Sequence, residues 1–133
     1  MIKLKTKEEI AILKEGGRRL AFILNEVKEK VAPGVKTNEL EKLARDLIKQ
    51  GEDDAAFLDY SPQGAPRPYP AALCVSINEE VVHGIPKDRE LKVGDVVGLD
   101  LGLIHDGMYT DMAVTVPVGK ISREAEKMIK VAE

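Results

Sequence analysis

The chain has 133 residues, enough for one domain with one core and too few for two. Apolar residues make up 44% and charged residues 32%, and the charges are interspersed, which excludes a disordered chain. The net charge is −3 and no basic stripe is present, so we expect no nucleic-acid partner. Cys74 is the only cysteine, which excludes a disulfide within the chain.

The hydropathy pattern favours neither a membrane protein nor an exported one. Residues 1–5 lack the apolar core of a secretory signal. No segment approaches the roughly twenty apolar residues that cross a bilayer. A single cysteine suits a reducing compartment. We therefore expect a soluble cytoplasmic domain that makes no membrane contact.

Two helices are predicted before residue 51. Thr6 followed by Glu9 is typical of a capping box, and Pro33-Gly34 should end the first helix. Its apolar stripe has the spacing of one helix face: Ile10, Leu13, Gly17, Leu20, Leu24, Val27 and Val31. Gly17 would let another element approach closely. The second helix should begin at Thr37 as its N-cap and end at Gly51.

The middle of the chain predicts a loop followed by short strands. Residues 61–70 hold four of the seven prolines and should form a loop. Residues 72–77 predict a strand, and Val81-Val82 should return beside it after a turn.

The last residues predict a third helix. Ser122 is the expected N-cap, and four apolar residues lie on one side: Ala125, Met128, Ile129 and Ala132. Because this pattern runs to Glu133 without a cap, we expect a single domain over residues 1–133 that is truncated within a helix.

Residues 95–118 predict a β-hairpin whose two-residue turn is Asp106-Gly107. Such a turn places Gly102 opposite Asp111 and Asp100 opposite Ala113, with all four side chains on one face. The other face should be core: Leu99, Leu101, Leu103, Thr110, Met112 and Val114. Asp100 and Asp111 then become diagonal neighbours, roughly 7–8 Å apart at the backbone.

Two carboxylates on one sheet face repel each other unless a cation or a proton intervenes. A divalent metal ion is the usual resolution, and the alternative is a face open to water where both groups are merely solvated. Two ligands alone do not complete a metal site. His105 and Asp106 flank or form the turn, and we interpret them as turn residues rather than ligands.

His83 and Cys74 are the other candidate functional residues. His83 follows a strand and precedes a glycine, so its ring can project from a strand end and donate to a substrate carbonyl. The alternative is an ordinary surface histidine. Cys74 is expected to be a small buried hydrophobic residue on its strand.

Four segments resemble the type I methionine aminopeptidases, which are pita-bread metallopeptidases. Residues 69–86, YPAALCVSINEEVVHGIP, are similar to that family's central signature. Residues 92–100, KVGDVVGLD, and 106–111, DGMYTD, match its two-aspartate hairpin, and residues 33–40, PGVKTNEL, match its interhelix link. The resemblance implies an α+β fold, namely the N-terminal half of a pita-bread domain, with two helices packed on a mostly antiparallel sheet.

The resemblance also implies a function. The family removes the initiator methionine from nascent proteins with two divalent metal ions of the Co, Mn, Fe or Zn type. Asp100 and Asp111 would be metal ligands, and His83 would be the catalytic group that hydrogen-bonds the substrate. Tyr69 and Cys74 would line the pocket for the methionine side chain. The family's other ligands belong to a second half, so metal binding and activity should be weak or absent in this chain.

The expected partners are peptides and nascent chains with an N-terminal methionine, with the ribosome as a further candidate. The alternative function is a non-catalytic pita-bread module that binds protein or peptide partners. Such modules lose metal ligands, whereas Asp100, Asp111 and His83 are all present, which favours the enzyme. Unpaired strand edges predict a homodimer that replaces the missing half.

Overall fold

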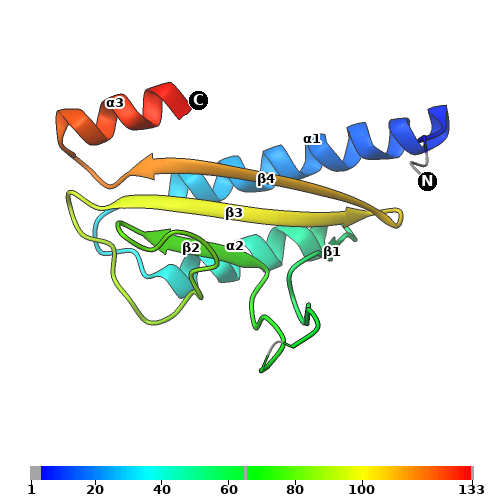
Figure 1. Cartoon of the computed structure of the whole chain (residues 1–133), viewed down its shortest axis with the longest axis horizontal. Helices are drawn as coiled ribbons and strands as arrows, with labels where there is room; N and C mark the ends of the chain where they lie inside the picture. The colour runs from blue at the N-terminus through cyan, green and yellow to red at the C-terminus, as the bar shows by residue number, and fades with distance from the viewer. Residues whose placement is uncertain (1–3, 65, 133) are drawn as a thin grey trace.

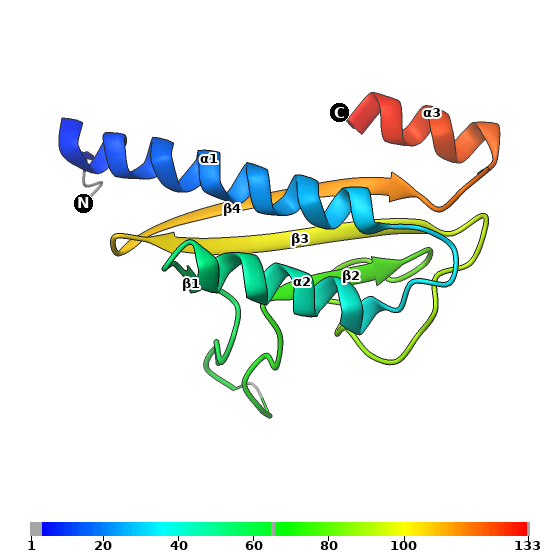
Figure 2. The ribbon, with the colours of Figure 1, turned by 180° about the vertical axis from the view of Figure 1, so that it is seen from behind.

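A computed structural model describes residues 4–64 and 66–132. Two helices, α1 (Lys7–Lys30) and α2 (Thr37–Gln50), lie across one face of an antiparallel sheet (Figures 1 and 2). The strands are β1 (Asp54–Ala55), β2 (Leu73–Ile77), β3 (Val96–His105) and β4 (Met108–Pro117), and α3 (Arg123–Ala132) follows them. The predicted α+β architecture is therefore present. The first three residues and Glu133, on which the predictions for the chain ends rest, lie outside the described residues.

Strand β3 is the centre of the sheet. It pairs with β4 along one side and with β2 and the two-residue β1 along the other. The hairpin register is the predicted one, with Gly102 opposite Asp111 and Asp100 opposite Ala113. The turn residues Asp106 and Gly107 have φ values of 46° and 75°, as a tight hairpin turn requires. The short strand β1 was not predicted.

The core between the helices and the sheet is aliphatic. Its largest fully buried members come from both helices, from the segment between β2 and β3, and from the sheet: Leu20, Leu24, Leu40, Leu73, Ile77, Leu91, Leu99, Leu101 and Leu103. The predicted core face of β3 is thus confirmed. The prediction for Met112 is wrong, since its side chain is 40% exposed at the edge strand β4, where the helices give less cover.

The predicted N-caps of α1 and α3 and the predicted end of α2 at Gly51 are correct, and the predicted N-cap of α2 is wrong. Thr6 and Glu9 form the capping box, with Oγ1 of Thr6 accepting from the Glu9 backbone N–H at 3.2 Å. Oγ of Ser122 accepts from the Ala125 N–H at 3.1 Å. The N-cap of α2 is Lys36, because the Thr37 hydroxyl instead exchanges hydrogen bonds of 2.8 and 2.9 Å with the backbone of Lys87. Thr37 therefore joins α2 to the segment between β2 and β3.

The glycine that permits close approach in α1 is Gly16, and the prediction of Gly17 is wrong. Gly16 is buried, and a Cβ there would lie 3.2 Å from Cβ of His105. Within the described residues, and apart from its own helix, nothing lies within 4 Å of a Cβ built at Gly17. Ile10 is also 43% exposed, so the buried stripe begins later than predicted.

The prediction that Val81-Val82 returns as a strand is wrong. Neither residue is in a strand, and their exposed fractions are 88% and 61%. The chain instead meets β2 at Gly84, whose carbonyl accepts from the Val75 N–H at 2.8 Å. A Cβ at Gly84 would lie 2.1 Å from the Val75 oxygen, so a side chain is excluded there. No helix in the described part of the chain is both long and apolar enough to span a membrane.

Candidate functional site

The five residues predicted for the site line one cavity of about 450 Å³. It opens on the face of the β3–β4 hairpin opposite the buried leucines, because side chains alternate along a strand. Asp100 comes from β3, Asp111 from β4 and Cys74 from β2, while Tyr69 precedes β2 and His83 follows it. The structure brings these residues together, and their individual roles stay predictions.

Both aspartates line the cavity. Asp100 is half-buried, and its Oδ1 atom is buried with no hydrogen-bond partner among the described residues. Burial raises the pKa of Asp100, the charge of Asp111 raises it further, and His83 opposes the shift. An orphaned carboxylate oxygen beside a second carboxylate is an arrangement that a divalent cation stabilises.

The residues present fit such a cation only in part. Among the described residues, no group of three or more His, Cys, Asp or Glu side chains is placed to hold a metal ion. A cation bound there would have only the carboxylates of Asp100 and Asp111 as ligands from the described residues, which is fewer than a complete coordination shell needs.

His83 lines the cavity and has an unusual backbone conformation. Its φ is 58°, in the left-handed region that costs a non-glycine residue of order 1–3 kcal/mol. The next residue, Gly84, is held against β2 by its carbonyl and by a 3.2 Å hydrogen bond from its N–H to Oγ of Ser76. These bonds fix the backbone next to His83, whose exposed side chain lines the cavity.

Tyr69 and Cys74 form a neutral wall of the cavity. The Tyr69 hydroxyl lies 3.1 Å from the Gly84 carbonyl and 3.2 Å from that of Leu73 and donates toward them. Burial raises the pKa of the Tyr69 phenol and of the Cys74 thiol. The Cys74 side chain is buried, as predicted, while also lining the cavity. Neither group is poised to act as a nucleophile, and both can contact an apolar ligand.

Other lining residues come from the loop before β2 and from the segment after His83. They are Phe57, Tyr60, Pro62, Pro66, Arg67, Pro68, Pro70 and Ile85. Phe57 occupies the space beside Gly102, since a Cβ on that glycine would lie 2.7 Å from Cε1 of the ring. Gly102 thus admits an aromatic ring next to the aspartates. The glycine in the strand was the available signal, although it did not reveal which residue would fill the space.

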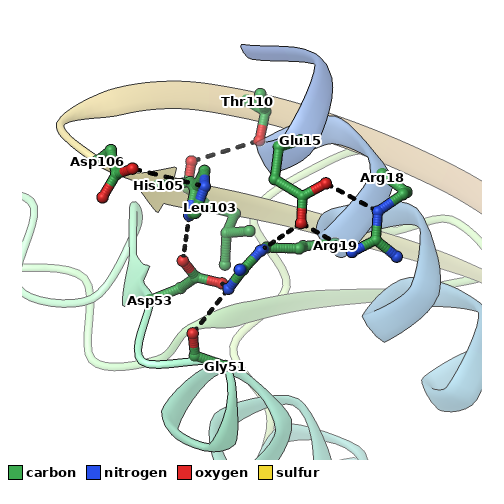
Figure 3. Close-up of polar contacts among 9 residues, drawn as sticks. All are labelled: Glu15, Arg18, Arg19, Gly51, Asp53, Leu103, His105, Asp106 and Thr110. Carbon is green, nitrogen blue, oxygen red and sulfur yellow. Dashed lines mark hydrogen bonds and ion pairs between the residues drawn. The ribbon is translucent and has the colours of Figure 1, made fainter. Parts of the chain in front are cut away.

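His105 lies outside the cavity in a separate polar network (Figure 3). Its Nδ1 is 2.7 Å from Oδ1 of Asp53, and Nη1 of Arg19 is 3.2 Å from Oδ2 of the same carboxylate. Arg19 also donates to the Gly51 carbonyl at 2.8 Å and to Glu15 at 2.9 Å. The network joins α1, the end of α2 and the hairpin, so His105 fastens elements together. Sequence analysis missed Asp53 and Arg19.

Comparisons with known proteins agree with this geometry. The model of metallopeptidase family M24 matches residues 11–133. The methionine aminopeptidase of Aquifex aeolicus is 45% identical over 130 residues, covering 97% of this chain and 50% of that protein. The one from Clostridium perfringens is 41% identical over 133 residues, covering 100% and 51%.

A solved structure gives the same result. The methionine aminopeptidase from Thermotoga maritima superimposes with a TM-score of 0.91 at 36% identity, covering 98% of this chain and 51% of that one. The chain therefore spans about half the length of the relatives it matches, and its fold is the predicted half of a pita-bread fold.

Proposed function

Because the chain belongs to metallopeptidase family M24, we propose that it carries part of the active site of a metal-dependent aminopeptidase that removes N-terminal methionine. The observation that supports this most is the carboxylate pair in one cavity with the buried, unpartnered Oδ1 of Asp100. The similarity to methionine aminopeptidases supports the choice of substrate.

Asp100 and Asp111 would hold divalent ions of the Co, Mn, Fe or Zn type. Such ions, when bound, polarise a carbonyl and lower the pKa of a water molecule. Two carboxylates without nitrogen ligands hold these ions loosely, so binding by the single chain should be weak.

The other residues would bind and orient the peptide. His83, which lines the cavity, would be the catalytic group that donates a hydrogen bond to the scissile carbonyl as negative charge develops on its oxygen. Tyr69 and Cys74 would contact the methionine side chain, because both are neutral and line the cavity beside its apolar residues.

The biological setting follows from that substrate. We propose that nascent chains with a free N-terminal methionine are met in the cytoplasm, where the ribosome is a candidate partner. We also propose that residues 1–133 form one folding unit, equivalent to the N-terminal half of such a catalytic domain, and that two copies associate.

A chimaera tests the function. The 130 matched residues of the Aquifex aeolicus relative are replaced by this chain, and release of methionine from Met-Ala-Ser is measured with Mn²⁺. We expect hydrolysis that Asp111→Asn abolishes. His83→Ala should lower kcat by about 10²–10³, the effect of removing one donor to a developing oxyanion.

The controls are Nα-acetyl-Met-Ala-Ser, which should not be cleaved, and circular dichroism to verify folding of each variant. A folded chimaera that binds the peptide without hydrolysing it would overturn the proposal and favour the non-catalytic peptide-binding module. Undiminished turnover by His83→Ala would remove His83 from the mechanism.

A further inference from the structure

We propose that Glu41 of α2 is a positioning residue for the cavity wall formed by Tyr69 and Cys74, and that it acts together with Arg45 by fixing the backbone between those two residues. That this wall contacts the side chain of an N-terminal methionine rests on the proposed function. The positioning itself depends only on contacts among the described residues.

The Glu41 carboxylate lies where strand β2 begins. Helix α2 packs against β2 and brings the carboxylate to this place (Figure 2). The backbone N–H groups of Ala72 and Leu73 each donate to it at 2.8 Å, one to each oxygen. Ala72 and Leu73 are fully buried, so removing the Glu41 side chain would deprive two buried N–H groups of their acceptor.

Arg45 holds the same carboxylate from one turn along α2. Its Nε forms an ion pair with Glu41, whose side chain is only 12% exposed. Its Nη2 also donates to the Pro70 carbonyl at 2.9 Å. The two side chains therefore bind the backbone of residues 70–73 through three hydrogen bonds in which one partner is charged. Such bonds are stronger than those between neutral groups, so this backbone is firmly held.

The segment of residues 70–73 connects the two residues of the wall. Tyr69 directly precedes it, Cys74 directly follows it, and both line the cavity. The Tyr69 hydroxyl donates toward the Leu73 carbonyl at 3.2 Å, so Leu73 contacts Glu41 through its N–H and Tyr69 through its C=O. A shift of this segment would move both side chains of the wall. Misplacement by about 1 Å is enough to impair a site.

A second ion pair on α2 provides a matched control. Lys42 and Asp46 have the same spacing as Glu41 and Arg45, but their side chains are 76% and 52% exposed. Within the described residues, neither side chain forms a hydrogen bond to the segment of residues 70–73. Exposed pairs of this kind contribute little to stability. A change at Lys42 should therefore leave the wall in place.

Cys74 reports on the wall in the chain as it is, without any need for activity. It is the only cysteine and is buried, so a thiol reagent reaches it when the wall opens locally. Glu41→Gln and Arg45→Met should each raise the rate of Cys74 alkylation by iodoacetamide about tenfold, because each removes hydrogen bonds that hold the segment. Lys42→Met should react at the rate of the wild type.

The two variants also separate the position of the thiol from its acidity. Burial raises the pKa of the Cys74 thiol, and the charge of Glu41 adds to that rise. Glu41→Gln would therefore speed alkylation through a lower pKa alone. Arg45→Met removes a positive charge and would not lower the pKa, so faster alkylation in this variant indicates a displaced wall. An unchanged or slower rate in folded Arg45→Met would overturn the proposal.

A general loss of stability predicts a different result. Asp53→Ala removes contacts to His105 and Arg19 and none to the segment of residues 70–73. It should leave the alkylation rate unchanged, because Cys74 is exposed by local opening. Equal acceleration by Asp53→Ala and Glu41→Gln would contradict positioning, since Cys74 would then report only global unfolding. Circular dichroism verifies that each variant is folded.

The chimaera tests the consequence for the substrate. Arg45→Met and Glu41→Gln should each raise KM for Met-Ala-Ser about tenfold and change kcat by less than about twofold, because the wall contacts the side chain and not the reacting atoms. Lys42→Met should keep both constants. Unchanged KM in both variants of an active chimaera would overturn the positioning and leave the proposed function intact. An inactive chimaera would refute the function, while alkylation of Cys74 still decides the positioning.

Discussion

At Asp100 the fold places a carboxylate in surroundings that disfavour its charged form, the form that the proposed metal site needs. Leu99 and Leu101 on either side of this residue are fully buried, so the backbone of β3 is fixed and Asp100 is held half-buried in the sheet. Its Oδ1 has no protein partner among the described residues, and its pKa is raised by burial and by Asp111. A carboxyl group whose pKa is higher in the folded state favours folding when protonated. That contribution is lost as the pH rises from the unfolded pKa through the folded one.

We therefore predict that Asp100→Asn raises the melting temperature of the metal-free chain at pH 7. The gain should shrink as the pH falls toward 3.8, the ordinary pKa of this carboxyl. Mn²⁺ should stabilise the wild type and not the variant. Thermal melts across pH, with and without Mn²⁺, measure both effects.

Asp95, the residue directly before β3, is the matched control for Asp100. Burial opposes the shift, but hydrogen bonds from the Lys92 N–H and the Asn78 amide lower the pKa of Asp95. Asp95→Asn should therefore destabilise the chain at pH 7, with the deficit vanishing in acid. If Asp100→Asn behaved like Asp95→Asn, the carboxylate of Asp100 would have a stabilising partner, and the metal-site argument would fail.

At the scale of elements, α1 packs closely against the β3–β4 hairpin at Gly16, whose backbone lies beside two side chains of the hairpin. Gly16 faces His105 and Thr110, whereas Gly17 faces open space within the described structure. His105 is also held by Asp53, so it has little freedom to yield.

The two neighbouring glycines should therefore respond differently to alanine. Gly17→Ala should raise the free energy of unfolding by about 0.5–1 kcal/mol, the helix-propensity gain of alanine over glycine. Gly16→Ala should give no net gain, because the added methyl would lie 3.2 Å from Cβ of His105. Urea denaturation of both variants measures the difference. Equal gains would show that α1 is packed less closely on the hairpin than described.

The network around Asp53 yields a second prediction for elements. The Asp53 side chain is 3% exposed and contacts both His105 and Arg19. Asp53→Ala removes the partner of the His105 ring and one of the acceptors of Arg19, and should lower the free energy of unfolding by about 2 kcal/mol. Asp54→Ala, at the exposed neighbour in β1, should change it by less than about 0.5 kcal/mol. Urea denaturation of the two variants measures the free energy of unfolding. Similar losses in both variants would mean that the contacts of Asp53 add little to stability.

For the whole molecule, stability rests on α1, α2 and the sheet and hardly on α3. The core contains residues of both N-terminal helices and of β2, β3 and β4, and none from α3. A chain ending at Lys120 should keep its fold, with a free energy of unfolding within about 1 kcal/mol of the full chain. Calorimetry and far-ultraviolet circular dichroism test this. A large loss of cooperativity would show that α3 belongs to the folding unit.

Local patterns in the sequence determined much of this molecule. The capping box of Thr6 and Glu9 is a contact between residues three apart, and the turn at Asp106-Gly107 sets the whole β3–β4 register. Strand alternation then placed Asp100 and Asp111 on one face. These features depend on short-range geometry, so spacing along the chain was sufficient to predict them.

Tertiary structure decided what depends on segments distant in the chain. Thr37 could not be recognised as a partner of Lys87, nor Asp53 as the partner of His105, because these pairs are 50 and 52 residues apart. Whether Gly16 or Gly17 is the contact point depends on how α1 rotates on the hairpin. Met112 is exposed because β4 is a strand edge, which its alternating pattern does not reveal. In each case packing between elements selects the partner, and no local rule encodes that choice.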